Sequence, residues 1–154
     1  MPPDITVFFR AYADLYNEAL SVAPDYEAIA GCFAKCFIAA GPKGVSCEAN
    51  DEAFRQALRD GFDFYRLIGA RRLDFNRLEE TRIDADHVMA RVFYSARYVR
   101  PGGAQVVIDF SVVYLIAAEA DAWKIFAYIA GDEMALYREA GLLENVSVPP
   151  SLQN

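Results

Sequence analysis

Few side chains in this 154-residue chain are of the types that transfer protons. Arg77 and Glu79 are the most unusual of them, because the segment Leu73–Ile83 around them alternates between apolar and polar residues as a β-strand does. If Ile83 pairs with Val88, both charges share the apolar face of the strand. Buried charges are costly unless they are paired or solvated. This register therefore predicts a wet cavity that holds a guanidinium and a carboxylate, with Glu79 as the candidate general base.

A β-bulge in the same segment gives the alternative interpretation. One extra residue in the middle of the strand would reverse the alternation and turn Arg77 and Glu79 towards solvent. Glu79 is the only inward carboxylate that the pattern offers, so a bulge would leave the cavity without a candidate base. The sequence leaves both alternatives open.

Aromatic residues are expected to form the rest of the cavity wall. Tyrosine hydroxyls on an inward face can donate hydrogen bonds to a ligand carbonyl, although such tyrosines commonly do no more than pack in a core. A pocket of this composition suits an apolar ligand about as large as a ring. The expected pocket residues are Tyr16, Tyr65, Arg77, Glu79, Tyr94, Tyr114 and Trp123.

The three cysteines and the single histidine give no recognisable metal site. Cys32 and Cys36 could share a helix face, but together with Cys47 and His87 they match no zinc spacing. Three cysteines cannot all pair, and free thiols suit a reducing compartment, so we expect a cytoplasmic protein. No GxSxG, HExxH or phosphate-binding glycine motif occurs. We therefore expect neither a metal nor a cofactor.

Composition indicates one soluble domain. The chain is 55% hydrophobic, which excludes intrinsic disorder, and its net charge of −7 opposes nucleic-acid binding. The N-terminal sequence MPPDITVFF lacks the basic region of a secretory signal. The longest apolar run, Val106–Ala118, contains Asp109 and Ser111 and is too short to cross a membrane. We expect a single domain over residues 1–154, ordered from about residue 4 to 144 and frayed from Asn145.

Three helices are predicted in the first half of the chain, each from an apolar stripe of helical period and a capping residue. They run from Asp4 to before Pro24, from Asp25 to about Phe33, and from Asn50 or Asp51 to Gly69. Two short strands, 37–40 and 45–48, flank a Gly-Pro-Lys-Gly turn between the second and third helices.

After Gly69 the period changes from helical to alternating, which predicts strands joined by hairpin-like turns. The strands are Leu73–Ile83, Val88–Val99, Gln105–Ala117 and Trp123–Ile129, and a last helix covers Glu133–Ala140. Helices followed by an antiparallel meander form an α+β layout, with the helices on one face of a curved sheet.

The alternation also predicts which side of the sheet faces the helices. Pairing Phe110 with Tyr94 brings only apolar residues and tyrosines onto one face, and we assign that face to the helices. The reverse face still carries Met89, Phe93, Val113 and Leu115, which would expose a large apolar patch in a monomer.

Several short motifs occur in a characteristic order. They are Tyr16 on the first helix, Pro24-Asp25-Tyr26-Glu27-Ala28-Ile29, Ala40-Gly41-Pro42-Lys43-Gly44 and Trp123-Lys124-Ile125. Together with the order of the elements they resemble the nuclear transport factor 2-like superfamily, also called SnoaL-like, over about Ile5 to Leu143. The resemblance implies a cone of three N-terminal helices on a strongly curved antiparallel sheet, with a short C-terminal helix. It also implies a homodimer formed through the outer sheet face.

Three catalytic arrangements of the resembled superfamily lack essential groups in this chain. Ketosteroid isomerases place an aspartate base before the proline of the early turn, where Gly41 stands here. Asp109 resembles their oxyanion acid locally, but our register points it outward. Limonene-epoxide hydrolases need an aspartate where Ile125 stands, and scytalone dehydratases need cavity histidines, whereas His87 lies in a turn.

Two functions from different classes remain. The first is a pocket for a small apolar ligand, with isomerase-like or dehydratase-like proton transfer by Glu79 if the protein is an enzyme. The second is a non-catalytic dimerisation or protein-interaction module whose cone is filled by its own large side chains. The volume of the cavity discriminates between them.

Overall fold

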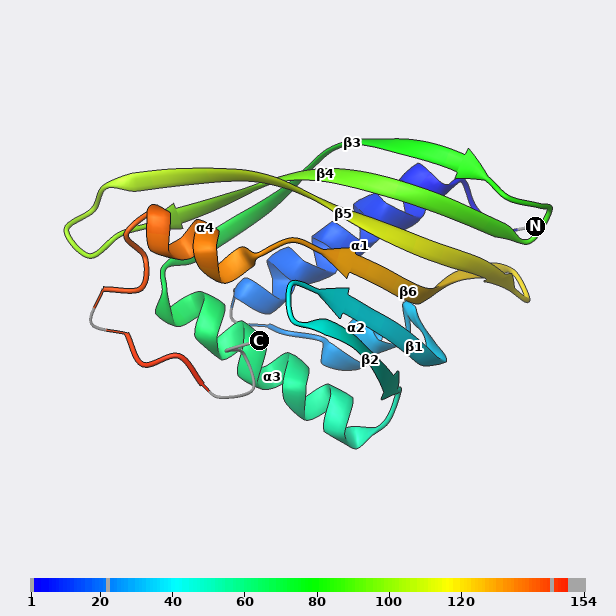
Figure 1. The fold of residues 1–154 in the computed structure, drawn as a ribbon, viewed down its shortest axis with the longest axis horizontal. Helices are drawn as coiled ribbons and strands as arrows, with labels where there is room; N and C mark the ends of the chain where they lie inside the picture. The colour runs from blue at the N-terminus through cyan, green and yellow to red at the C-terminus, as the bar shows by residue number, and fades with distance from the viewer. Residues whose placement is uncertain (1, 22, 145, 150–154) are drawn as a thin grey trace.

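In the computed structural model, which describes residues 2–21, 23–144 and 146–149, helices lie inside the curve of one six-stranded sheet (Figure 1). The helices are α1 (Ile5–Leu20), α2 (Tyr26–Ala30), α3 (Glu52–Leu67) and α4 (Glu133–Glu139). The strands are β1 (Phe33–Gly41), β2 (Gly44–Ala49), β3 (Ala70–Arg82), β4 (His87–Val99), β5 (Gln105–Glu119) and β6 (Ala122–Ala130). The predicted α+β cone is confirmed.

Aspartate caps determine where the helices begin. Asp4, Asp25, Asp51 and Asp132 each accept a hydrogen bond from a backbone N–H in the first turn of the helix that follows. Helix α2 ends earlier than predicted, since Phe33 is buried as the first residue of β1. Gly69 ends the α3 region with φ of +94°, and a Cβ there would lie 2.1 Å from the Val99 carbonyl oxygen. Only glycine fits this turn into β3.

The strand order is β2-β1-β6-β5-β4-β3. Strands β3 to β6 form the predicted antiparallel meander, and Tyr94 pairs with Phe110 as predicted. The sheet as a whole is mixed rather than antiparallel, because β1 runs parallel to β6. The β1–β2 hairpin thereby covers the edge of β6 that the meander leaves open, and the Ile125 N–H donates to the Cys32 carbonyl at this junction.

The structure selects the β-bulge in β3. Phe75 pairs with Tyr94 and Arg77 pairs with Phe93, so Asn76 is the extra residue. Beyond it Leu78 takes the inward position opposite Val92. The bulge turns Arg77 and Glu79 outward and places Leu78, which is partly buried, on the inner side of β3. Glu80 and Arg82 follow on that side near the end of the strand, where both are exposed.

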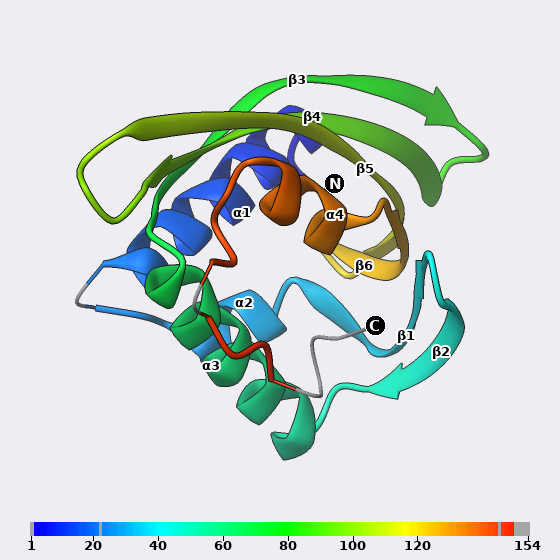
Figure 2. The ribbon, with the colours of Figure 1, turned by 60° about the vertical axis from the view of Figure 1, so that its left-hand side comes forward.

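Helix α1 is held against the sheet by a side-chain amide. The Asn17 Nδ2 group donates to the Leu73 carbonyl at 2.9 Å, and Asn17 Oδ1 accepts from the Leu73 N–H at 2.7 Å. In Figure 2 the sheet arches over α1 and α4, with α3 on the open side of the arch. This arrangement directs the tyrosines of α1 towards those of β4 and β5.

The last described residues also contact the core. Leu142 is buried, and Val146 and Val148 pack against the core cluster, where the sequence predicted fraying. Asn145 and the residues from Pro150 onward lie outside the described part of the chain. Within the described residues, no helix is both long and apolar enough to cross a membrane.

Candidate functional site

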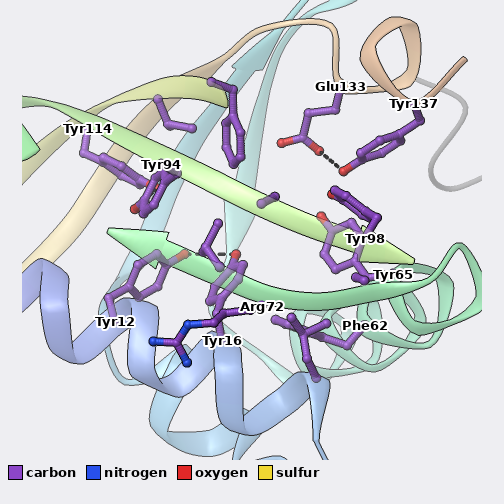
Figure 3. Close-up of a pocket in the computed structure, with 16 residues that line it drawn as sticks. Tyr12, Tyr16, Phe62, Tyr65, Arg72, Tyr94, Tyr98, Tyr114, Glu133 and Tyr137 are labelled. Carbon is purple, nitrogen blue, oxygen red and sulfur yellow. Dashed lines mark hydrogen bonds between the residues drawn. The ribbon is translucent and has the colours of Figure 1, made fainter. Parts of the chain in front are cut away.

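The helices and the inner face of the sheet form a small chamber, and seven of the sixteen residues that line it are tyrosines (Figure 3). Its volume is about 90 Å³. Helix α1, helix α3, the inner faces of β4 and β5, and α4 all contribute residues to it. The tyrosines of its wall are Tyr12, Tyr16, Tyr65, Tyr94, Tyr98, Tyr114 and Tyr137.

Four of these phenols form two hydrogen-bonded pairs. Tyr12 donates to the hydroxyl of Tyr16, one helical turn further along α1, at 3.2 Å. The hydroxyls of Tyr94 and Tyr114 lie 2.9 Å apart on neighbouring strands. Burial is the main cause that raises the pKa of each of the four above its usual value, so all four stay neutral. We call them the phenol quartet; they can hydrogen-bond a ligand oxygen or nitrogen.

Glu133 is the carboxyl group of the chamber. It is half-buried at the first position of α4, and its Oε2 accepts from the Tyr137 hydroxyl at 3.5 Å. In Figure 3 Glu133 projects from α4 on one side of the chamber, and Tyr94 and Tyr114 lie on the other. Burial raises the pKa of Glu133, and the hydrogen bond from Tyr137 acts in the opposite direction. A carboxyl group with a raised pKa holds its proton more tightly than an ordinary glutamate, so it can act as a proton donor as well as an acceptor.

Electrostatic coupling shows how closely the phenols surround this carboxyl. The charge of Glu133 is the largest cause that raises the pKa of Tyr65, ahead of burial. Burial raises the pKa of Tyr98 to about 12, with a further contribution from Glu133. The charge of Glu133 therefore acts on several phenols of the chamber.

A larger cleft joins the chamber from the open end of the cone. It has a volume of about 660 Å³ and lies between the β1–β2 hairpin, α3 and the start of α4. The residues that line both spaces are Tyr12, Tyr16, Tyr65, Val112, Tyr114 and Glu133. A dry cavity of roughly 150 Å³ is needed to hold benzene, so the chamber alone admits only the tip of a ligand. The body of the ligand has to occupy the cleft.

The structure brings together only part of the pocket expected from the sequence. Tyr16, Tyr65, Tyr94 and Tyr114 lie in the chamber wall. Trp123 is buried elsewhere, where its Nε1 donates to the Pro3 carbonyl at 2.7 Å and holds the N-terminal segment in place.

Arg77 and Glu79 do not belong to the pocket, and the prediction of Glu79 as a general base is wrong. Both side chains are exposed on the outer face, where their charged groups lie 3.3 Å apart. The Arg77 guanidinium stacks over the Phe93 ring at 3.8 Å. The bulge at Asn76 is the physical reason, because it reverses the side of the strand on which both residues lie.

Glu133 and Tyr137 belong to the site but were not predicted from the sequence. An acidic residue in the first turn of a helix is normally explained by the helix dipole, and Glu133 directly follows the Asp132 cap. The available signal was the spacing of four residues between Glu133 and Tyr137, which places both on one helix face. Only the fold shows that this face is turned into the cone.

A family model describes the same architecture. The model for "NTF2-like protein (DUF6841)" matches residues 3–133. The chain belongs to this NTF2-like family. The match ends at Glu133, so most of α4, including Tyr137, lies beyond it.

Several solved structures share the fold of this chain at low sequence identity. The protein Aln2 from a Streptomyces species is 15% identical, with a TM-score of 0.66 over 90% of this chain and 99% of its own. An NTF2-like protein with a cystatin-like fold from Novosphingobium aromaticivorans is 14% identical, with a TM-score of 0.64 over 90% of this chain and 86% of its own.

A ketosteroid isomerase-like protein from Erwinia carotovora atroseptica is 14% identical, with a TM-score of 0.59 over 82% of this chain and 92% of its own. No curated protein matches the sequence. Structural similarity at such low sequence identity shows only that the fold is shared. The chemistry has to be argued from the residues of the site itself.

Proposed function

We propose that this NTF2-like protein binds a small, mainly apolar ligand in the cleft, and that Glu133 exchanges a proton with the polar end of that ligand in the chamber. The observation that carries this proposal is a half-buried carboxyl group with a raised pKa that lines a cavity together with neutral phenols. Catalytic carboxyl groups commonly combine such burial with a raised pKa.

The surrounding groups suit proton transfer of the isomerase or dehydratase class. Glu133 can take a proton from the ligand or return it, and the phenol quartet can hold a ligand oxygen through neutral hydroxyl donors. The similarity to a ketosteroid isomerase-like structure agrees with this class at the level of the fold. The catalytic group differs from the one expected from the sequence, since Glu133 replaces Glu79.

The alternative of a filled, non-catalytic cone is less well supported. Large side chains do fill part of the interior, among them Phe9 and Phe62, which are almost fully buried. A cleft of about 660 Å³ nevertheless lies within the usual range for small-molecule sites, roughly 300–1,000 Å³.

Binding of the neutral fluorescent dye Nile red tests the pocket. Ala57 lines the cleft on α3, so Ala57→Trp should narrow the cleft and weaken dye binding. The adjacent Gln56 is exposed on the same helix and does not line the cleft, so Gln56→Trp is the matched control and should bind the dye as the wild type does. Absence of binding by the wild type, or equal binding by both variants, contradicts the proposal.

Carboxyl ¹³C NMR of Glu133 tests the proton exchange. We expect its resonance to titrate above the ordinary glutamate range and to shift when a ligand occupies the cleft. If the resonance titrates in the ordinary glutamate range and no ligand shifts it, the proposed role of Glu133 is contradicted.

We further propose a homodimer formed through the outer sheet face, with Met89, Phe93, Val113 and Leu115 at its centre. Met89 is 38% exposed there, and Ile129, which pairs with Val113, is 57% exposed. Burial of these side chains against a second copy would remove an apolar patch from water. The stacking of Arg77 on Phe93 already covers part of the patch.

A cytoplasmic location completes the proposal. Cys32, Cys36 and Cys47 are all free, and Cys36 and Cys47 are exposed. Exposed free thiols are typical of proteins kept in reducing compartments.

A further inference from the structure

The carboxyl group of Glu133 has hydrogen-bonding capacity that the protein leaves unused. An ionised carboxylate can accept about four hydrogen bonds. In the described part of the chain, the one hydrogen bond recorded for this carboxyl comes from Tyr137, at the long distance of 3.5 Å. The remaining acceptor positions of Glu133 can therefore serve a donor on the ligand.

The charges around the combined cleft and chamber favour a cation as that donor. Glu48, Asp51 and Glu133 line the two spaces, against Lys43 and Arg72. The Arg72 guanidinium is already engaged, since its Nε lies 2.6 Å from Asp74 Oδ1. The whole chain carries a net charge of −7. A carboxylate or phosphate on the ligand would be repelled, and a positive group would be attracted.

The aromatic residues that line the cleft also favour a positively charged ligand. Its ring-bearing residues include Phe33, Phe37, Phe54 and Tyr128, next to the tyrosines of the chamber. Aromatic rings bind apolar groups and also attract cations through their π-electrons. The charges of Glu133 and Glu48 both contribute to the raised pKa of Tyr128, so this ring of the cleft wall lies within electrostatic reach of two carboxyl groups.

We propose that the ligand is an apolar amine whose protonated nitrogen is held by Glu133, while its hydrocarbon body lies in the aromatic cleft. This inference rests on the proposed function and specifies its ligand class. The positive nitrogen offsets the cost of ionising a partly buried carboxyl group, and the hydroxyl oxygens of the phenol quartet can accept its remaining N–H groups.

A series of three naphthalene compounds of the same size tests the charge preference. The probes are 1-naphthylmethylamine (a cation at neutral pH), 1-naphthylmethanol (neutral) and 1-naphthoate (an anion), each titrated by calorimetry. We expect the amine to bind at least about tenfold more tightly than the alcohol, as for a hydrogen bond to a charged group, and the naphthoate to bind most weakly. Glu133→Gln should bring the amine to the affinity of the alcohol. Glu79→Gln, on the outer face, should leave the wild-type order unchanged.

The outcomes separate this inference from the proposed function. If the alcohol binds as tightly as the amine, the amine proposal is overturned while the ligand pocket stands. If the preference for the amine survives Glu133→Gln and disappears in Glu48→Gln, the nitrogen is held at the hairpin and the assignment to Glu133 is overturned. If none of the probes binds, both proposals fail. The wild-type series decides the charge preference even if Glu133→Gln does not fold.

Discussion

Replacing Tyr94 or Tyr114 by phenylalanine removes one hydroxyl from a pair that lies 2.9 Å apart inside the cone. The two residues are only 2% and 5% exposed, so the hydroxyl left behind has no access to bulk water. A buried polar group that loses its partner costs about 1–3 kcal/mol, whereas removal of both partners is nearly neutral. Tyr94→Phe and Tyr114→Phe should each destabilise the fold, and the double variant should cost no more than either single change.

Urea unfolding measures this effect directly. With a slope of about 2 kcal/mol per molar urea, each single variant should lower the unfolding midpoint by roughly 0.5–1.5 M. Because the double variant should cost no more than one single change, the double-mutant cycle should give a coupling energy of at least about 1–3 kcal/mol between the two hydroxyls. An unchanged slope shows that the midpoints report stability rather than a change in the unfolded state.

The reasoning would be refuted if the two single effects were additive, or if both were close to zero. Either result would mean that water in the chamber satisfies each hydroxyl separately. The phenol quartet would then be a hydrated surface rather than a dry, preorganised set of donors, and the proposed role of these tyrosines would lose its basis.

Three other predictions concern the contact of Asn17 with the sheet, the carboxyl group of Glu133 and the outer face of the sheet. Asn17→Ala should lower stability by about 2 kcal/mol in urea unfolding, because it removes both hydrogen bonds to Leu73; an unchanged midpoint would contradict this. Because burial raises the pKa of Glu133, the folded state keeps a proton that the unfolded state releases, so stability is lost as pH rises from the ordinary glutamate range through the raised value. Glu133→Gln should flatten that pH dependence in thermal unfolding, and an equally steep dependence would argue against it. Sedimentation should give twice the chain mass, and Met89→Lys with Leu115→Lys should give monomers; a monomeric wild type would end the dimer proposal.

Much of the fold could be predicted because its signals are local. The aspartate caps mark the helix starts, and the change of period after Gly69 marks the beginning of the antiparallel meander. The Tyr94–Phe110 register also follows from the sequence, since a shift by one residue would expose the entire apolar face of β4. These features depend on residues that are near neighbours along the chain or across one hairpin.

The site depended on contacts between segments far apart in the sequence. Alternation alone allowed Arg77 and Glu79 to face inward, and only the competition between Leu78 and these charges for the inner face placed the bulge at Asn76. The parallel pairing of β1 with β6 joins strands separated by most of the chain, and a local pattern carries no information about it.

The sequence by itself determined the helices, the strands of the meander and the apolar face that they share. Tertiary structure alone decided that α4 folds back into the cone and places Glu133 among phenols from α1, α3, β4 and β5. The physical reason is that hydrophobic periodicity records whether a side chain is buried, but not which other side chains it meets. A carboxyl group acquires its unusual proton affinity only from those neighbours.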